Sequence, residues 1–202
     1  MKIGFIGTGL MGAPMIKNLL KSKHQISIFN RTISKARKLK KYGAYLSYKI
    51  DELVKDKEII ITMLTDDKAV NDIIRSKTFL NNVCKQTTVI DMSSTKPSTA
   101  LDNYKTLKKK GVYFLDAPVS GGTKGAESAS LAIMVGGEKK IYKKNLKVLK
   151  MLGIPNYVGK PSSGQAAKLA NQIIVGITIG AVSEAIISVS YTHLTLPTND
   201  LV

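Results

Sequence analysis

Residues 2–12 of the chain read Lys-Ile-Gly-Phe-Ile-Gly-Thr-Gly-Leu-Met-Gly. The apolar run 2–6 predicts a short buried strand, and the glycines after it predict a tight turn. Met15, Ile16 and Leu19 then follow at helical spacing, which predicts an amphipathic helix. A G-x-G-x-x-G run between a strand and a helix is typical of a dinucleotide-binding site, and this context favours such a site over a purely structural turn.

The three glycines of this turn are expected to have different physical roles. Gly7 allows a sharp turn off the strand, and Gly9 lacks the Cβ that would keep a pyrophosphate away from the backbone. Gly12 lets the new helix pack closely against the strand. The phosphates would then meet backbone N–H groups at the positive end of the helix.

The following chain alternates between strand-like and helix-like segments. Strands are expected near residues 2–6, 26–29, 58–63, 88–92, 112–116, 131–135 and 156–158, and helices near 11–22, 34–42, 67–76, 97–110 and 138–151. This alternation predicts an α/β fold built on a doubly wound, mostly parallel sheet of the Rossmann type.

One long helical pattern follows from about residue 164 to residue 187, apolar over most of its circumference. Thr178, Ser183 and Glu184 interrupt it, so we expect the uninterrupted apolar part to be too short to span a bilayer and the protein to have no membrane partner. A helix that is apolar on nearly all sides is expected to be buried against another layer.

Composition limits the partners of the chain. Its 202 residues carry a formal net charge of +17, from 28 lysines and 3 arginines against 14 acidic residues. Nucleic-acid readers rely on arginine and aromatic platforms, so we expect no nucleic-acid partner but an attraction for small phosphates and carboxylates. The single cysteine, Cys84, and two histidines predict no metal site and no intrachain disulfide, as in a cytoplasmic protein.

The end of the second expected strand points to the choice of cofactor. An Asp or Glu about 20 residues after the glycine turn binds the ribose of NAD, but Asn30 and then Arg31 stand at this place. Arg31, Thr32 and Lys35 are suited to a 2′-phosphate. The sequence therefore favours NADP, with NAD as the alternative.

Several motifs, in order, resemble the β-hydroxyacid dehydrogenase family. They are the glycine turn 7–12, Asn-Arg-Thr at 30–32, Asp-Met-Ser-Ser-Thr at 91–95, Asp-Ala-Pro-Val-Ser-Gly-Gly at 116–122, and the segments 125–127, 133–137 and 164–172. This family includes 3-hydroxyisobutyrate dehydrogenase, tartronate semialdehyde reductase and the glyoxylate/succinic semialdehyde reductases. The resemblance covers residues 2 to about 187.

The resemblance implies an oxidoreductase that transfers a hydride between NADP(H) and a small 3-hydroxy acid or semialdehyde, with Lys168 as general acid and base. It implies that Ser120, Gly121 and Gly122 bind the substrate carboxylate, and that Asn171, with Gln172 as a further candidate, orients the substrate oxygen. The implied cofactor-binding residues are Gly7, Thr8, Gly9, Leu10, Met11, Gly12, Asn30, Arg31, Thr32, Met63, Leu64 and Thr95. Asp116 is expected to stabilise its loop.

The resemblance also predicts the domain organisation. Residues 1–161 would form the NADP-binding Rossmann-type domain, 162–188 would begin an all-α domain whose remainder is missing, and 189–202 would be a non-native tail that resembles translated sequencing-adapter read-through. A genuine, divergent C-terminus is the alternative. In this family the helical domain completes the active site and forms the subunit interface, which implies a homo-oligomeric parent protein and an inactive fragment.

Two departures and two alternative functions stay open. Ala129 and Ser162 stand where the family usually has glycine, which puts the geometry of both loops in doubt. The chain is alternatively a non-catalytic dinucleotide-binding module, although Lys168, Ser120 and Asn171 together argue against this. Imine reduction on the same framework is less favoured, because such enzymes usually replace the catalytic lysine.

Overall fold

The computed structural model describes residues 1–191. The chain divides into two units, Met1–Lys168 and Leu169–Val202, and the second is described only as far as residue 191. Each unit is described by itself. The nine strands of the first unit are β1 (Lys2–Ile6), β2 (Gln25–Phe29), β3 (Tyr45–Leu46), β4 (Ile59–Thr62), β5 (Thr88–Asp91), β6 (Tyr113–Asp116), β7 (Val119–Ser120), β8 (Leu131–Gly137) and β9 (Gly153–Gly159).

These strands form one sheet in the order β3-β2-β1-β4-β5-β6-β8-β7, with β9 paired to β8. The strands from β3 to β6 pair in parallel, whereas β8 runs antiparallel to both β6 and β7. This is the doubly wound, mostly parallel sheet that the sequence predicts. Two strands of two residues each, β3 and β7, were not predicted, because they are too short to show any periodicity.

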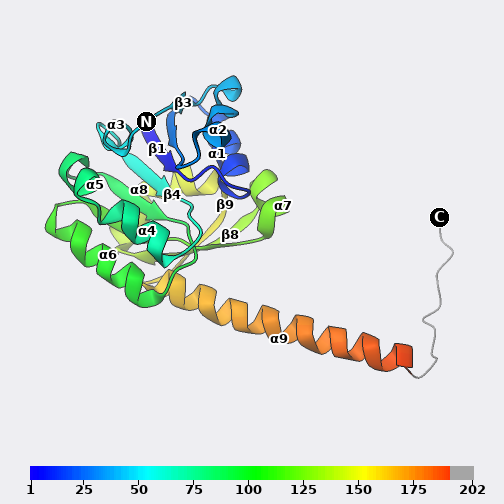
Figure 1. Ribbon diagram of the computed structural model, residues 1–202. Helices are drawn as coiled ribbons and strands as arrows, with labels where there is room; N and C mark the ends of the chain where they lie inside the picture. The colour runs from blue at the N-terminus through cyan, green and yellow to red at the C-terminus, as the bar shows by residue number, and fades with distance from the viewer. Residues whose placement is uncertain (192–202) are drawn as a thin grey trace. The chain divides into compact units, whose positions relative to one another are not determined.

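Helices cover both faces of the sheet (Figure 1). The helices of the first unit are α1 (Gly12–Leu20), α2 (Ile33–Arg37), α3 (Ile50–Val54), α4 (Asp67–Ile74), α5 (Lys77–Asn82), α6 (Pro97–Lys109), α7 (Gly122–Glu127) and α8 (Lys139–Lys150), with a 3-10 turn η1 (Lys40–Tyr42). A further helix, α9 (Ser163–Tyr191), begins in this unit and continues into the second. The expected helix at 34–42 is thus divided into α2 and η1. The short helices α3, α5 and α7 were not predicted.

Two hydrophobic clusters hold these layers together. One cluster joins the α1 and α8 side chains to Ile59 and Ile61 of β4, and the other joins α4, α5 and α6 to Ile60 of the same strand. Successive residues of a strand point to opposite faces, so a run that is apolar at every position supplies both cores. The loops at the carboxyl ends of the parallel strands are then left to form a site.

The two loops with unexpected residues do adopt a backbone that favours glycine. Ala129 has φ +56° and Ser162 has φ +78°, both in the left-handed region. An L-residue with a Cβ is disfavoured there. Both loops therefore keep the glycine-like conformation at a cost in backbone strain.

Helix α9 begins in the first unit and continues through the described part of the second. The unit boundary after Lys168 lies inside this helix, and residues 189–191 still belong to it. The remainder of the expected tail, 192–202, lies outside the described residues. The domain limits at 161 and 188 stay predictions.

The apolar character of α9 is strong. Ser163–Ser190 is long and apolar enough to cross a membrane by length and composition, with a mean hydropathy of 2.0, although one such helix is weak evidence. Within this span, the apolar 18-residue stretch has no residue buried inside the described part of the chain, so the expected covering layer is not seen there. The expectation that the apolar part is too short to span a bilayer is therefore wrong by length and composition, whereas the expectation of no membrane partner stays a prediction.

Candidate active site

In the glycine turn between β1 and α1, the packing of the protein leaves no room for a side chain at two of the glycines but leaves room at the third. Gly7 has φ +106°, and a Cβ on it would collide with the Met63 carbonyl oxygen. A Cβ on Gly12 would collide with the Gly7 carbonyl oxygen, so α1 packs as closely as predicted. A Cβ on Gly9 would meet nothing within 4 Å. The space beside Gly9 is therefore open for a ligand.

Asn30 holds this turn in place. Its Oδ1 accepts a hydrogen bond from the Thr8 backbone N–H at 2.9 Å, and its Nδ2 donates to the Thr32 carbonyl at 3.0 Å. The Gly7 N–H donates to the Phe29 carbonyl at 3.0 Å. The sequence suggested Asn30 as a cofactor contact, but did not reveal that its amide links the two loops.

A cavity of about 310 Å³ lies over this turn. Seven of the expected cofactor-binding residues are among those that line it: Gly7, Gly9, Asn30, Arg31, Thr32, Met63 and Leu64. Lys35 also lines it, as does Asp72, whose carboxylate pairs with Lys68 at 2.8 Å. We call this hollow the turn cavity. Thr8 and Leu10 line a neighbouring hollow instead, and neither set includes Met11, Gly12 or Thr95.

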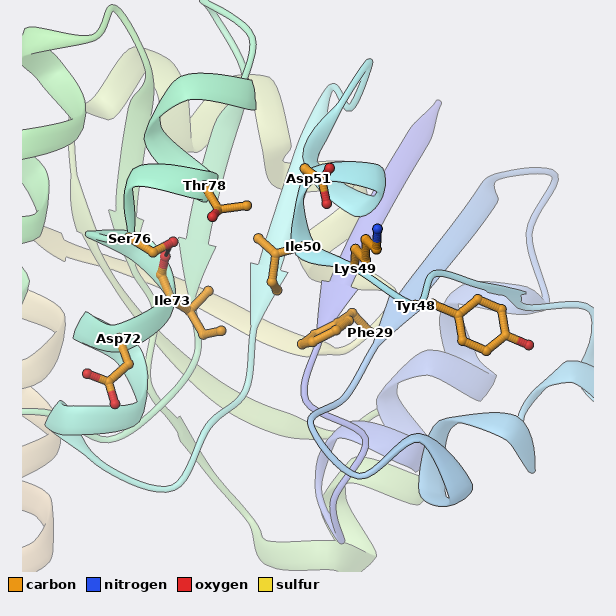
Figure 2. Close-up of a pocket in the computed structure, with 9 residues that line it drawn as sticks. All are labelled: Phe29, Tyr48, Lys49, Ile50, Asp51, Asp72, Ile73, Ser76 and Thr78. Atoms are coloured by element: carbon orange, nitrogen blue, oxygen red, sulfur yellow. Dashed lines mark hydrogen bonds between the residues drawn. The ribbon is translucent and has the colours of Figure 1, made fainter.

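A larger hollow of about 510 Å³ adjoins the turn cavity and shares Phe29, Asp72 and Ile73 with it. Figure 2 shows Phe29, Ile50 and Ile73 around this hollow, while the Tyr48 ring points away from the other labelled side chains. No part of the glycine turn lines it. The smaller turn cavity is therefore the better candidate for the dinucleotide.

A second group of contacts joins the loop after β5 to the start of α9. The buried Gln165 side chain accepts a hydrogen bond from the Thr95 N–H at 3.0 Å and donates to the Ser93 carbonyl at 2.7 Å. The Ser93 hydroxyl in turn accepts from the Leu64 N–H at 2.9 Å. Sequence reasoning missed Gln165 and Ser93, although both lie within quoted motifs, because their contacts span 29 to 72 positions.

The same helix start is held by Asp116, at the carboxyl end of β6. Its two oxygens accept hydrogen bonds from the backbone N–H groups of Ser162 and Gln165, at 2.8 and 3.0 Å. Burial raises the pKa of Asp116 to about 6, although these hydrogen bonds act in the opposite direction. Asp116 thus anchors the start of α9 to the end of β6, and the expected stabilisation of its own loop stays a prediction.

Asp91 lies beside Asp116 in the register of β5 and β6. One oxygen accepts hydrogen bonds from the Thr62 hydroxyl at 2.8 Å and the Ser93 N–H at 3.1 Å. Burial raises its pKa to about 6, and the charge of Asp116 acts in the same direction. Its other oxygen has no hydrogen-bond partner among the described residues. The two carboxyls form a buried pair under the candidate site.

Lys168 lies almost one helical turn after Gln165 and is half-buried. Burial lowers the pKa of its ammonium group. A lowered pKa favours exchange of a proton with a reacting oxygen near neutral pH. Asn171 and Gln172, which share a 3.4 Å hydrogen bond, belong to the second unit, so their place in one site with Lys168 stays a prediction.

Ser120, Gly121 and Gly122 connect β7 to α7. Gly121 and Gly122 have φ +128° and +60°, values that favour glycine. Both glycines are exposed, and a Cβ on Gly122 would meet nothing within 4 Å. The loop is accessible, but its binding of a carboxylate stays a prediction.

Two buried hydroxyls fit a bound dinucleotide. The Oγ1 atoms of Thr8 and Thr95 are buried and have no hydrogen-bond partner among the described residues. Such atoms are costly unless a ligand or water pairs with them. Together with the open space at Gly9, they match the polar groups that a nicotinamide dinucleotide presents. Residues 1–191 contain no group of three His, Cys, Asp or Glu that could hold a metal ion.

A family model described as the NAD binding domain of 6-phosphogluconate dehydrogenase matches residues 2–174 of the chain. The mitochondrial 3-hydroxyisobutyrate dehydrogenase of Drosophila melanogaster is 39% identical over 184 residues, which cover 91% of this chain and 56% of that protein. The 2-hydroxy-3-oxopropionate reductase of Escherichia coli K12 is 37% identical over 197 residues, or 94% of this chain and 65% of the reductase.

Among solved structures, a Mycobacterium tuberculosis 3-hydroxyisobutyrate dehydrogenase with L-serine matches with a TM-score of 0.91 and 31% identity. The match covers 96% of this chain and 66% of that one. The chain thus spans less than two thirds of the two curated relatives named above.

Proposed function

The chain belongs to the family described as the NAD binding domain of 6-phosphogluconate dehydrogenase, in its 3-hydroxyisobutyrate dehydrogenase-like branch, and we propose that it forms the cofactor-binding part of a 3-hydroxy acid dehydrogenase or reductase. The substrate is a small 3-hydroxy acid or the matching semialdehyde. The nicotinamide cofactor, when bound, supplies or accepts the hydride.

The anchoring of Lys168 carries this proposal. Asp116 and Gln165 fix the first turn of α9 against the loops after β5 and β6. Lys168 follows on the same helix, with its pKa lowered by burial. In the reducing direction its ammonium donates a proton to the substrate carbonyl oxygen, and in the oxidising direction its amine accepts the hydroxyl proton.

The substrate carboxylate is assigned to the loop of Ser120, Gly121 and Gly122, and Asn171 is assigned to orient the substrate oxygen. The names of the relatives support this substrate class, because 3-hydroxyisobutyrate and 2-hydroxy-3-oxopropionate are both small carboxylates. Backbone N–H groups in a glycine loop and a serine hydroxyl are suitable donors for such an anion.

NADP is the proposed cofactor, with NAD as the alternative. Arg31 and Lys35 line the turn cavity, and Asn30 replaces the carboxylate that would repel a 2′-phosphate. Asp72 is the acidic residue in this lining, and its pairing with Lys68 reduces its repulsion. We also propose a cytoplasmic, homo-oligomeric parent protein without nucleic-acid or membrane partners.

The experiment that tests the function compares two lysine variants in the full product of the gene. Lys168→Ala should keep NADPH binding, seen as enhanced nicotinamide fluorescence, and lose turnover of glyoxylate or succinic semialdehyde by about 100-fold or more. The exposed Lys160 supplies a matched control, Lys160→Ala, which should keep both. Retained turnover in Lys168→Ala would refute the assignment of the proton donor. NADPH binding without turnover in the unmodified protein would favour the non-catalytic alternative.

A further inference from the structure

A second cavity of the first unit, about 430 Å³ in volume, is walled by lysines. Its lining includes Lys17 of α1, Lys35 of α2, Lys38 directly after α2 and Lys41 of η1, together with part of the glycine turn. No Asp or Glu contributes to its lining. We call it the lysine cavity. Gly9 and Lys35 line both this cavity and the turn cavity, so the two hollows are neighbours.

The positive charge around the lysine cavity is not balanced by acidic residues in the same part of the sequence. The first 50 residues contain nine lysines, two arginines and no Asp or Glu. Among the described residues, none of the four cavity lysines makes a salt bridge. Like charges gathered within a Debye length repel one another, and a bound anion relieves that repulsion.

Other side chains hold and complete the lysine cavity. The Tyr42 ring lies 4.6 Å from the Lys17 Nζ and 5.2 Å from the Lys41 Nζ, within range of cation–π attraction. Hydrogen bonding and charge from Lys17, and to a lesser degree Lys41, lower the pKa of the Tyr42 phenol. Thr8 also lines the cavity, is only 5% exposed, and has a hydroxyl without a partner among the described residues. The wall therefore offers an unused hydroxyl beside several ammonium groups.

We propose that the lysine cavity binds a phosphate monoester group. A compact dianion matches several ammonium point charges gathered in one hollow. An extended phosphodiester chain is less suited, because it needs a long basic track and aromatic stacking platforms. The phosphate group has two candidate sources. One is the 2′-phosphate of an NADP molecule bound in the neighbouring turn cavity, and this source rests on the proposed function. The other is a separate phosphorylated small molecule.

The test measures binding of inorganic phosphate to the chain by calorimetry at low salt. The variant Lys17→Gln/Lys38→Gln should weaken binding at least five-fold. Lys143→Gln/Lys147→Gln, which removes two exposed charges from α8, is the matched control and should stay within two-fold. In a second readout, phosphate should protect Lys38 but not Lys143 from acetylation, as measured by mass spectrometry. Equal weakening in both variants, or no protection of Lys38, would overturn the proposal.

Competition then identifies the source of the phosphate. If the cofactor supplies it, NADP displaces inorganic phosphate and NAD does not, and 2′-AMP binds more tightly than 5′-AMP. If a separate molecule supplies it, inorganic phosphate and NADP bind together. A 20-nucleotide DNA that protects Lys38 better than inorganic phosphate would overturn the monoester assignment. Loss of dinucleotide binding with phosphate binding intact would refute only the proposed function.

Discussion

The Asp116 side chain accepts a hydrogen bond from the Ser162 backbone N–H at 2.8 Å, across 46 positions of sequence. Its second oxygen accepts from the Gln165 N–H at 3.0 Å. The first N–H groups of a helix have no intrahelical partners. The carboxyl group at the end of β6 thus provides acceptors for two such N–H groups at the start of α9. The position of Lys168 on the next turn of that helix depends on this contact.

The stability of the first unit is expected to fall as the pH rises from about 4 to about 6. Burial raises the pKa of both Asp91 and Asp116 to about 6 in the folded chain, against about 3.9 when unfolded. The folded state therefore holds more protons in this window, and stability is lost as pH rises through it. A shift of this size corresponds to about 3 kcal/mol for each carboxyl. Urea unfolding, followed by circular dichroism at several pH values, measures the slope.

The variant Asp116→Asn separates the contribution of this carboxyl from other titrations. The asparagine side chain has no proton to lose, so the free energy of unfolding should change clearly less steeply between pH 4 and 6. Asp56→Asn changes an exposed carboxyl and should leave the slope of the parent. If Asp116→Asn and the parent show the same slope, the buried pair does not govern the pH dependence.

Replacement of Gln165 should loosen the loop after β5. Gln165→Leu removes both amide contacts and leaves the Ser93 carbonyl and the Thr95 N–H without these partners. Each unsatisfied buried group costs about 1–3 kcal/mol, so we expect a loss of about 2–4 kcal/mol in the free energy of unfolding. Gln25→Leu, at an exposed position of β2, is the control for the added apolar surface. A loss below about 0.5 kcal/mol in Gln165→Leu would show that the contact is unimportant for stability.

The sequence predicts this fold well where the signal is local. The alternating apolar runs and the glycines at 7, 9 and 12 predict the longer strands and the turn, because each depends on neighbouring residues. The strand–helix alternation predicts a mostly parallel sheet. The same locality explains what was missed. The role of Gln165, which reaches back 72 positions to Ser93, becomes visible only when β5 and α9 are placed together.

Asn30 illustrates a more subtle limit. Its spacing from the glycine turn predicts a residue at the cofactor ribose, and it does line the turn cavity. Its amide also bonds Thr8 and Thr32, which no spacing rule reveals. The roles of the substrate loop and of Asn171 stay predictions, because Asn171 belongs to the second unit.

Two glycine variants should separate stability from cofactor binding. A Cβ at position 12 would meet the rigid backbone of Gly7, so Gly12→Ala should lower the free energy of unfolding by about 2–3 kcal/mol. A Cβ at position 9 would meet no protein atom, so Gly9→Ala should fold with a stability within about 1 kcal/mol of the parent. Its NADPH affinity should nevertheless fall ten-fold or more. Unchanged affinity in Gly9→Ala would place the pyrophosphate elsewhere.

Arg31 should determine the choice between cofactors. A charge-assisted bond to a phosphate contributes about 1.5–3 kcal/mol, so Arg31→Gln should weaken NADPH binding by about ten-fold or more and leave NADH binding nearly unchanged. Fluorescence titration with both cofactors measures the ratio. Arg37→Gln, also exposed but outside the turn cavity, is the matched control. An equal effect of Arg31→Gln on both cofactors would assign Arg31 to the shared part of the dinucleotide.

The two strained loops predict stabilising variants. Ser162 and Ala129 have φ +78° and +56°, where an L-residue costs about 1–2 kcal/mol relative to its favoured conformation. Glycine removes that strain but adds about 0.5–1 kcal/mol of unfolded-state entropy, so Ser162→Gly and Ala129→Gly should each stabilise the chain by about 0.5–1 kcal/mol. Ser98→Gly in α6 supplies the control, because a glycine in a helix is destabilising by a similar amount.

Ser162→Gly has a further consequence, because the Ser162 N–H donates to Asp116. If that bond holds residue 162 at positive φ, the glycine variant keeps the bond and relieves only the backbone strain. The free energy of unfolding should then depend on pH between 4 and 6 as it does in the parent. Thermal unfolding at pH 5 and pH 7 measures both quantities in one series. A destabilised Ser162→Gly variant with an altered pH slope would instead mean that the serine side chain itself shapes the anchor of α9.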